Sequence, residues 1–178
     1  MKPRDKLLAI LSVLYVLTLF CGCLGGESDD VPFSTFSTDI GDVIIDIPYD
    51  LEPNKMSSGT MLLLAKPGTD KPIVGINLQD TWGYDFETVA GFYVGEGKTY
   101  TETTTNDGKR MLFYVFDGGR NLEGKPLYEY YAFIDYISDK DVVIEINSNS
   151  EIVLDGEVLA EFGTDEFKNI CRSFAFVS

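Results

Sequence analysis

Short turns recur along the chain after residue 33, and each one separates two stretches that have the composition of β-strands. The first pair is FSTFST and VIIDIP, joined by DIGD, and the second is TMLLLAK and IVGINLQ, joined by PGTDKP. Glycine, proline and aspartate favour tight turns, and strands joined by so short a turn pair with each other in antiparallel fashion. A chain of this kind is therefore restricted to a mainly antiparallel sheet.

The second half of the chain repeats the pattern with longer strands. KTYTETTT and RMLFYVF flank NDGK, where Asp107-Gly108 predicts a type I′ hairpin, and LYEYYAFIDYI and VVIEINS flank SDKD. RMLFYVF and LYEYYAFIDYI have apolar residues at both odd and even positions, which face opposite sides of a strand, so we expect two central strands that are covered on both faces. Residues 117–126, DGGRNLEGKP, are expected to form the loop between them.

Three stretches have apolar residues at helical spacing. The first is DFETVAGFYV, with Asp85 near its positive N-terminal end, and the others are EVLAEF and TDEFKNICRSF, the last capped by Thr164. Amphipathic helices must cover the faces of the sheet. The sequence thus predicts an α+β sandwich, a mainly antiparallel β-sheet flanked by helices, as a single domain over residues 33–178.

Four features give the chain a likeness to a known group of proteins. They are FSTFSTDIGDVIIDIPYDL with its strand ending in Pro48, the helix DFETVAGFYV, the long paired strands, and the closing FKNICRSFAF. Together they resemble the PsbP/Mog1/LpqN-like group over residues 33–178. The resemblance implies an α/β/α sandwich that serves in docking or accessory binding, and it carries no catalytic or binding residue over to this chain.

The chain begins with the basic segment MKPRDK and continues with an uncharged apolar run over residues 7–20. A helix of that length reaches about 21 Å, short of the ~30 Å hydrocarbon core, so an export signal is predicted. FCGC, which ends at Cys23, resembles the lipobox of prokaryotic lipoproteins, although Phe20 stands where that motif usually has an aliphatic residue. We expect a signal peptide over residues 1–22 and lipid attachment at Cys23.

Residues 23–32 then form a flexible acidic linker between the lipid and the domain. The alternative is an uncleaved anchor over residues 7–24, about 27 Å as a helix, which could span a locally thinned bilayer. Both hypotheses place the protein at the cell membrane with its domain on the extracellular face. The partner on the membrane side is the bilayer itself, bound through the lipid on Cys23.

The composition excludes several classes of function. The chain has no histidine and a net charge of −15, which becomes −17 once residues 1–22 are removed. Without histidine no Ser-His or Cys-His nucleophile pair can form, and no cofactor or metal site is predicted. An acidic surface is repelled by nucleic acid. Calcium could use NDG, DKD or DGE, but each of these also serves as an ordinary turn.

The aromatic residues give the one predicted binding site. Tyr128, Tyr130 and Tyr136 share one face of a predicted strand and could line a groove beneath Trp82 and Tyr84. In the other interpretation the tyrosine rings are buried under a helix and their hydroxyls reach solvent. We expect a non-enzymatic envelope lipoprotein that binds a protein or a cell-surface polymer. The alternatives are a small-molecule binding protein that uses the aromatic face and, third, a hydrolase that uses carboxylates.

Overall fold

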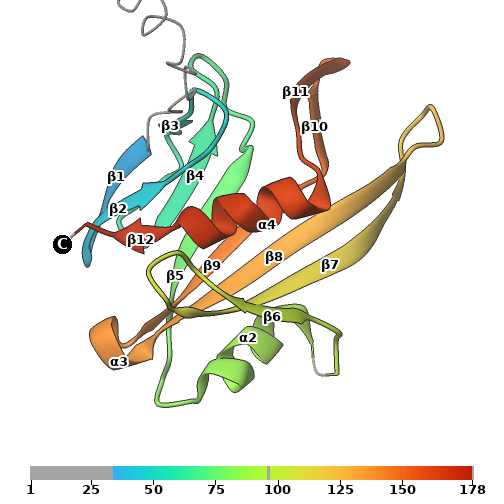
Figure 1. Ribbon diagram of the computed structural model, residues 1–178. Coiled ribbons are helices and arrows are strands. Elements are labelled where there is room, and N and C mark those ends of the chain that lie inside the picture. The colour runs from blue at the N-terminus through green and yellow to red at the C-terminus, as the bar shows by residue number, and fades with distance from the viewer. Residues whose placement is uncertain (1–33, 96, 178) are drawn as a thin grey trace, which may run out of the picture. The chain divides into compact units, whose positions relative to one another are not determined.

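A seven-stranded antiparallel sheet forms the centre of the folded unit in the computed structural model, which describes residues 34–95 and 97–177 (Figure 1). In spatial order its strands are β3 (Glu52–Pro53), β4 (Met61–Ala65), β5 (Val74–Asp80), β9 (Val142–Asn149), β8 (Pro126–Tyr136), β7 (Arg110–Arg120) and β6 (Thr101–Thr104). Every neighbouring pair in this sheet is antiparallel. The fold class predicted from the short turns is confirmed.

The strands β7 and β8 lie inside the sheet because both of their faces are apolar. Met111 and Phe113 of β7 belong to one buried cluster, whereas Leu112 and Tyr114 belong to another on the opposite face. β7 extends beyond its predicted end at residue 116, and β8 begins one residue earlier than predicted, so the loop between them shrinks from residues 117–126 to residues 121–125. Backbone pairing thus extends beyond the apolar run into the glycine-rich segment.

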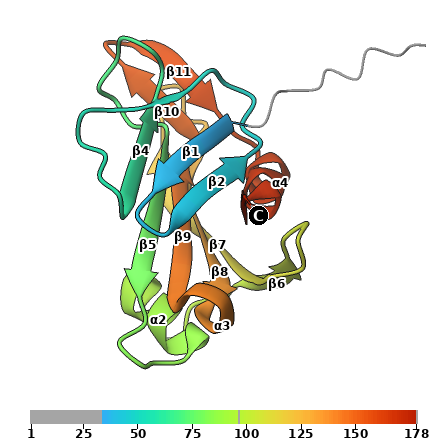
Figure 2. The same ribbon diagram turned by 90° about the vertical axis from the view of Figure 1, so that its left-hand side faces the viewer.

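Helices cover both faces of the sheet, as Figures 1 and 2 show. Helix α2 (Phe86–Val94) packs on one face through Phe86, Val89 and Ala90. The opposite face is covered by α4 (Thr164–Ser173) and by a small sheet of β1 (Ser34–Thr38), β2 (Gly41–Ile45) and β12 (Ala175–Phe176). The predicted α/β/α sandwich is therefore confirmed, with the larger core on the α4 side.

One predicted helix is wrong. EVLAEF forms β11 (Glu157–Glu161), which pairs with β10 (Glu151–Leu154) across a two-residue turn. Asp155 and Gly156 have φ angles of 53° and 85°, as a type I′ turn requires at both positions. Aspartate followed by glycine accepts this geometry at low cost, so the turn outweighs a helical spacing that extends over only six residues.

The β10–β11 hairpin leaves the main sheet where β8 begins, and Figure 1 shows it projecting from the body of the unit. At this point the Ser150 N–H donates to the Tyr128 carbonyl at 2.8 Å, and the Tyr128 N–H donates to the Ser150 hydroxyl oxygen at 2.9 Å. Two residues nearer the start of β8 lies Pro126, which has no N–H to donate. The ladder cannot continue there with a full set of bonds.

Two further local predictions need correction. At NDGK only Gly108 has a positive φ, 86°, and its N–H donates to the Thr105 carbonyl at 3.1 Å, so the turn is not type I′. Helix α4 is capped by Gly163 instead of Thr164, and the Glu166 carboxylate accepts a hydrogen bond from the Gly163 N–H. Asp85 caps α2 as its position suggested, since its carboxylate accepts from the Thr88 N–H.

Residues 1–22 and 23–32, with the predicted signal peptide, Cys23 and the linker, lie outside the described residues. Within the described part of the chain, no helix is both long enough and apolar enough to cross a bilayer.

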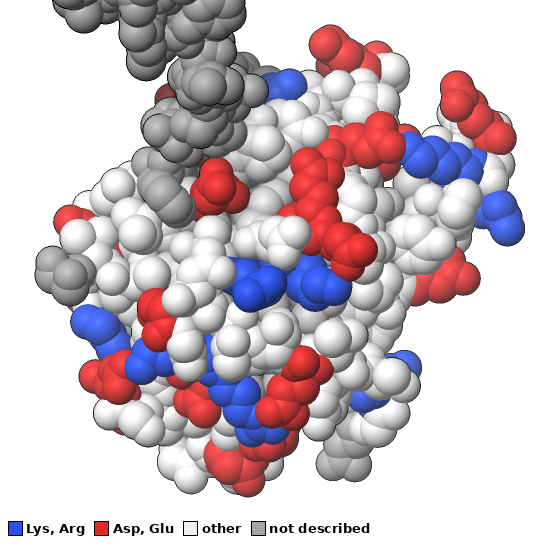
Figure 3. Space-filling model, viewed as in Figure 1, with Lys and Arg blue, Asp and Glu red and all other residues white. Residues whose placement is uncertain are grey.

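The short helix α3 (Ile137–Lys140) occupies the predicted SDKD turn between β8 and β9. Figure 3 shows acidic side chains gathered over the start of α4, where Asp165 and Glu166 form the first turn.

Candidate functional site

Five aromatic side chains are exposed around helix α2, and we call them the α2 surface. Their exposed fractions lie between 40% and 65%. They are Trp82, Tyr84, Phe92, Tyr93 and Tyr100. Exposed aromatic side chains gathered in one region of a surface mark sites of interaction, because their rings bury much apolar area on contact.

Trp82 is displayed by a turn that is unfavourable for so large a side chain. Its φ is 47° and that of Gly83 is 80°, and the Tyr84 N–H donates to the Thr81 carbonyl at 2.9 Å. The left-handed region costs a non-glycine residue about 1 to 2 kcal/mol. The Thr81 hydroxyl, which donates to the Asp141 carboxylate at 3.0 Å, holds the turn in place. Strain of this kind at an exposed aromatic residue suggests a functional constraint.

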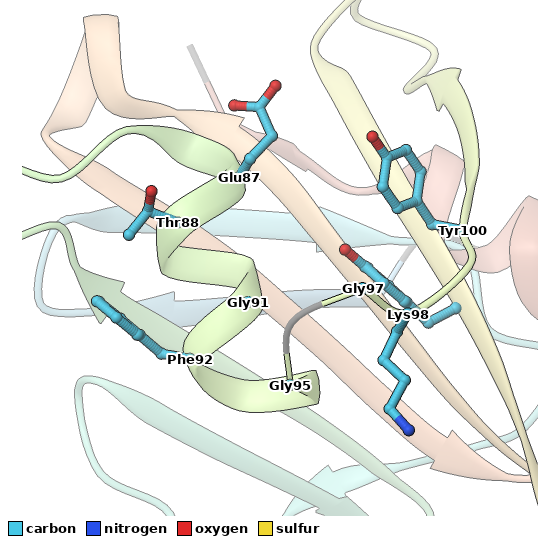
Figure 4. A pocket seen from close by; sticks show the side chains of 9 residues that line it. Glu87, Thr88, Gly91, Phe92, Gly95, Gly97, Lys98 and Tyr100 are labelled. Atoms are coloured by element: carbon cyan, nitrogen blue, oxygen red, sulfur yellow. The ribbon is translucent and has the colours of Figure 1, made fainter.

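A pocket of about 350 Å³ opens beside α2 (Figure 4). Residues at positions i, i+4 and i+8 of a helix share a face, and the pocket is built on the outward face of α2. The helix and its C-cap contribute Glu87, Thr88, Gly91, Phe92 and Gly95. The segment that leads into β6, together with β7, contributes Gly97, Lys98, Tyr100 and Tyr114.

Aromatic rings form much of the pocket. The rings of Tyr100 and Tyr114 lie 5.4 Å apart between centroids and are tilted by 57°. The ring of Phe92 meets that of Tyr84 edge to face at 5.2 Å, so the pocket is continuous with the rest of the α2 surface. Burial raises the pKa of the Tyr114 hydroxyl, with Tyr100 and Glu87 adding to the shift. This hydroxyl is therefore a neutral hydrogen-bonding group at physiological pH.

Arg110 of β7 ties α2 to the edge strand β6 next to the pocket. Its Nη1 donates to Glu87 at 2.6 Å, and its Nε and Nη2 donate to the two carboxylate oxygens of Glu102 at 2.7 and 3.1 Å. These bonds raise the pKa of Arg110 and lower that of Glu102. The Glu87 side chain is 50% exposed, so the Arg110–Glu87 pair adds at most about 1 kcal/mol, and its main effect is to fix the geometry.

The structure does not gather the five aromatic residues predicted as a binding site. Trp82 and Tyr84 belong to the α2 surface, but Tyr130 and Tyr136 are buried on the opposite face of the sheet beneath α4. Tyr128 is partly exposed and lines a shallow cavity near the start of β8. The four cavities described in residues 34–95 and 97–177 include none that is lined by both groups.

The buried tyrosines serve in packing. The ring of Tyr130 stacks on Phe167 of α4 at 5.3 Å, and its hydroxyl donates to the Phe162 carbonyl at 3.3 Å. The Tyr136 hydroxyl donates to the Asp107 carboxylate at 2.6 Å. Burial and this bond raise the pKa of Tyr136. Their rings lie under a helix, as the second interpretation expected, but their hydroxyls bond to the protein instead of to solvent.

Sequence reasoning missed Phe92, Tyr100 and Gly91 as site residues. A signal was present, because Phe92 and Tyr93 are adjacent in a helix and cannot both face the core. Tyr93, predicted on the inner face, lies at the edge of α2, where its hydroxyl donates to Gln79. The pocket itself depends on the distance between α2 and β6, which no sequence pattern reveals.

Glu145, the buried acidic residue among those that the structure describes, gives no support to a hydrolase. Glu145 is buried, but its two oxygens accept from Gln79 Nε2 at 2.6 Å and from Asn147 Nδ2 at 2.8 Å. It lines none of the four cavities described above. Among the described residues, no group of three or more His, Cys, Asp or Glu side chains is placed to hold a metal ion. Cys171 is fully buried, which raises the pKa of its thiol.

Comparison with known proteins gives distant likeness only. No protein-family model and no curated protein matches the chain. Among solved structures, a point mutant of protein Mog1 is 16% identical, with a TM-score of 0.45, and the match covers 82% of this chain and 96% of that one. The Ran-binding protein Mog1p of Saccharomyces cerevisiae gives the same identity and TM-score, over 83% and 96%. The likeness concerns the course of the chain alone.

Proposed function

We propose that this chain is a cell-envelope lipoprotein whose folded unit binds a partner at the cell surface through the α2 surface. The exposed aromatic residues around α2 are the observation that supports this function. Aromatic side chains dominate the energetics of binding surfaces, and Trp82 stands exposed on a strained turn. A lipid on Cys23, followed by a flexible linker, would hold this surface outside the membrane.

The proposed function is non-catalytic. The chain has no histidine, and the acid in the α2 pocket, Glu87, is half exposed and paired with Arg110. A general acid needs a raised pKa, whereas those of Asp85, Glu102 and Asp165 are lowered by hydrogen bonds. The small-molecule alternative relied on the face of β8 that carries Tyr130 and Tyr136. That face is filled by α4.

Photochemical crosslinking in living cells tests the proposal. A benzophenone side chain is placed at Tyr84 or at Phe92 of the full-length chain, and in a control at Met56, which is equally exposed but far from α2 in the sequence. We expect a discrete adduct from the two α2 positions, and loss of this adduct when Trp82→Ala is added. Equal labelling from Met56, or labelling that Trp82→Ala leaves unchanged, would contradict the assignment of the α2 surface.

The same cells test the lipid anchor. Intact-mass spectrometry of the purified chain should show that it begins at Cys23 and carries a lipid there. If the chain instead begins at an unmodified Met1, the uncleaved-anchor hypothesis replaces lipidation, and the crosslinks at α2 then report on binding alone.

A further inference from the structure

Gly91 lies in the interior of α2 and lines the pocket, although none of the residues that the structure describes requires a glycine there. Its φ is not in the left-handed region, and a Cβ atom at this position would meet no atom of the described residues within 4 Å other than its chain neighbours and the backbone of α2 itself. Glycine weakens a helix interior because it gives up the most conformational freedom on folding. The described part of the fold therefore gives no reason for a glycine at this position, and contact with a bound molecule is the reason that we consider.

At two other glycines, a neighbouring side chain leaves no room for a Cβ atom. A Cβ at Gly75 would lie 2.7 Å from the Asn147 side-chain oxygen, and one at Gly59 would lie 1.7 Å from the Asp39 carboxylate. Both positions are closed to any side chain by their neighbours. Gly91 instead exposes helix backbone to an open pocket, which allows a bound molecule to approach that backbone closely.

The pocket combines ring faces with polar atoms. In Figure 4 Gly91 lies between Thr88 and Phe92 on one side and Lys98 and Tyr100 on the other. An apolar side chain from a protein partner would cover the hydroxyls and the charged groups here without replacing their bonds to water, which is costly. A ring with C–H groups on its faces and hydroxyls on its edge satisfies both kinds of contact.

The charges described around the pocket balance. Glu87 and Glu102 are neutralised by Arg110, which binds both of them, and Lys98 at the rim leaves no excess of negative charge. A strongly cationic ligand would thus meet Lys98 in the pocket wall, while the carboxylate of Glu87 there is already paired with Arg110. An anionic polymer would be repelled by the chain as a whole, whose net charge is −15. The charges of the described residues around the pocket thus favour a ligand without charge.

We propose that this pocket binds a neutral sugar ring of a cell-surface polysaccharide, which enters the space left open at Gly91 with one C–H face toward the ring of Tyr100 and its edge hydroxyls toward Thr88 and Lys98. This inference rests on the proposed function and names the chemistry of its partner. The pocket, about 350 Å³, lies at the lower end of the range for small-ligand sites, so it holds a short part of the polymer.

Native electrophoresis in gels that contain a polysaccharide tests the proposal with the full-length chain in a neutral detergent. The probes are a glucan, a mannan, a galactan and glycol chitin, with alginate as the anionic comparison. We expect at least one neutral polymer to retard the chain and alginate not to. Gly91→Leu should fill the pocket and weaken retention about tenfold, whereas Asn169→Leu, at an exposed position of α4, should leave it unchanged.

The outcomes separate this inference from the function beneath it. Lack of retardation by all four neutral polymers, or retardation that Gly91→Leu does not weaken, overturns the sugar assignment. If the crosslinks at Tyr84 and Phe92 then lead to a protein, the α2 surface is a binding surface with a different partner. If both experiments fail, the proposed function fails with the inference. Circular dichroism of each variant confirms that the fold is intact.

Discussion

Gly91 is the residue at which stability and binding are opposed. Inside a helix glycine is disfavoured relative to alanine, and here the backbone is helical and the space beside it is open. A residue that lowers stability without any compensating contact in the fold is typical of functional sites. The strained turn at Trp82, a few residues earlier, has the same character.

Replacement of Gly91 by alanine should therefore stabilise the protein. We expect Gly91→Ala to raise the free energy of unfolding by about 0.5 to 1 kcal/mol, because alanine loses less conformational freedom in a helix. Urea denaturation followed by circular dichroism measures this change. Asn169→Ala in α4 is the matched control, since it also improves an exposed helical position but lies away from the pocket. A loss of stability in Gly91→Ala would mean that the position is crowded after all.

At this scale the sequence revealed which residues share a face but not what covers that face. The alternation of β8 places Tyr128, Tyr130 and Tyr136 together, and the structure agrees for the two that are buried in the same cluster. The sequence could not show that α4 fills this face, or that Trp82 and Tyr84 lie beside α2, which covers the other face of the sheet. That choice depends on the packing of helices distant in the sequence.

Among the elements, the β10–β11 hairpin shows how a turn can outweigh a spacing pattern. Its strands are short, and the six residues EVLAEF fit a helix or a strand equally well. The strand forms because the two preceding residues, Asp155 and Gly156, both adopt the left-handed conformation and so close a hairpin turn. The same dipeptide at Asp107-Gly108 also predicted a type I′ turn. That prediction is wrong, because only Gly108 adopts the left-handed conformation there. Local sequence favours a turn but does not fix its type.

The type I′ turn gives a prediction opposite in sign to that at Gly91. Gly156→Ala places a Cβ at a φ of 85° and should destabilise the hairpin by about 1 kcal/mol or more. Hydrogen exchange of the backbone amides in β10 and β11 measures the local effect, and urea denaturation measures the global one. Gly91→Ala is the control for the substitution itself. Equal gains in stability from both changes would contradict the left-handed assignment at Gly156.

Over the whole of the described unit, the pKa shifts concern groups that titrate at acid or at alkaline pH. The chain has no histidine, so no side chain with an ordinary pKa near neutrality is present. Burial raises the pKa of Tyr93, Tyr114, Tyr131 and Tyr136 and of the Cys171 thiol. Hydrogen bonds lower the pKa of Asp85, Glu102 and Asp165. Composition predicts the flat middle of the stability profile, whereas its two ends depend on burial and partners.

The signs of these shifts predict how stability changes with pH. A folded pKa above the unfolded value contributes stability that is complete below the unfolded pKa and is lost as pH rises, which for tyrosine begins near pH 10. The lowered carboxyl pKa values contribute stability that is lost as pH falls below about 4. We therefore expect a constant free energy of unfolding between about pH 5 and 8, and a decline on either side.

Tyr136 should account for much of the alkaline decline. Its ring is buried and its hydroxyl donates to Asp107, so ionisation would place two negative charges next to each other away from water. Tyr136→Phe removes the ionisable group; it should cost about 1 kcal/mol at neutral pH and reduce the loss of stability above pH 10. Urea denaturation across this range, with Tyr84→Phe at an exposed position as control, measures the difference. If stability declines equally in Tyr136→Phe and in the wild type above pH 10, other groups cause the decline. The first cause to test is then the self-repulsion of an acidic chain, which added salt screens.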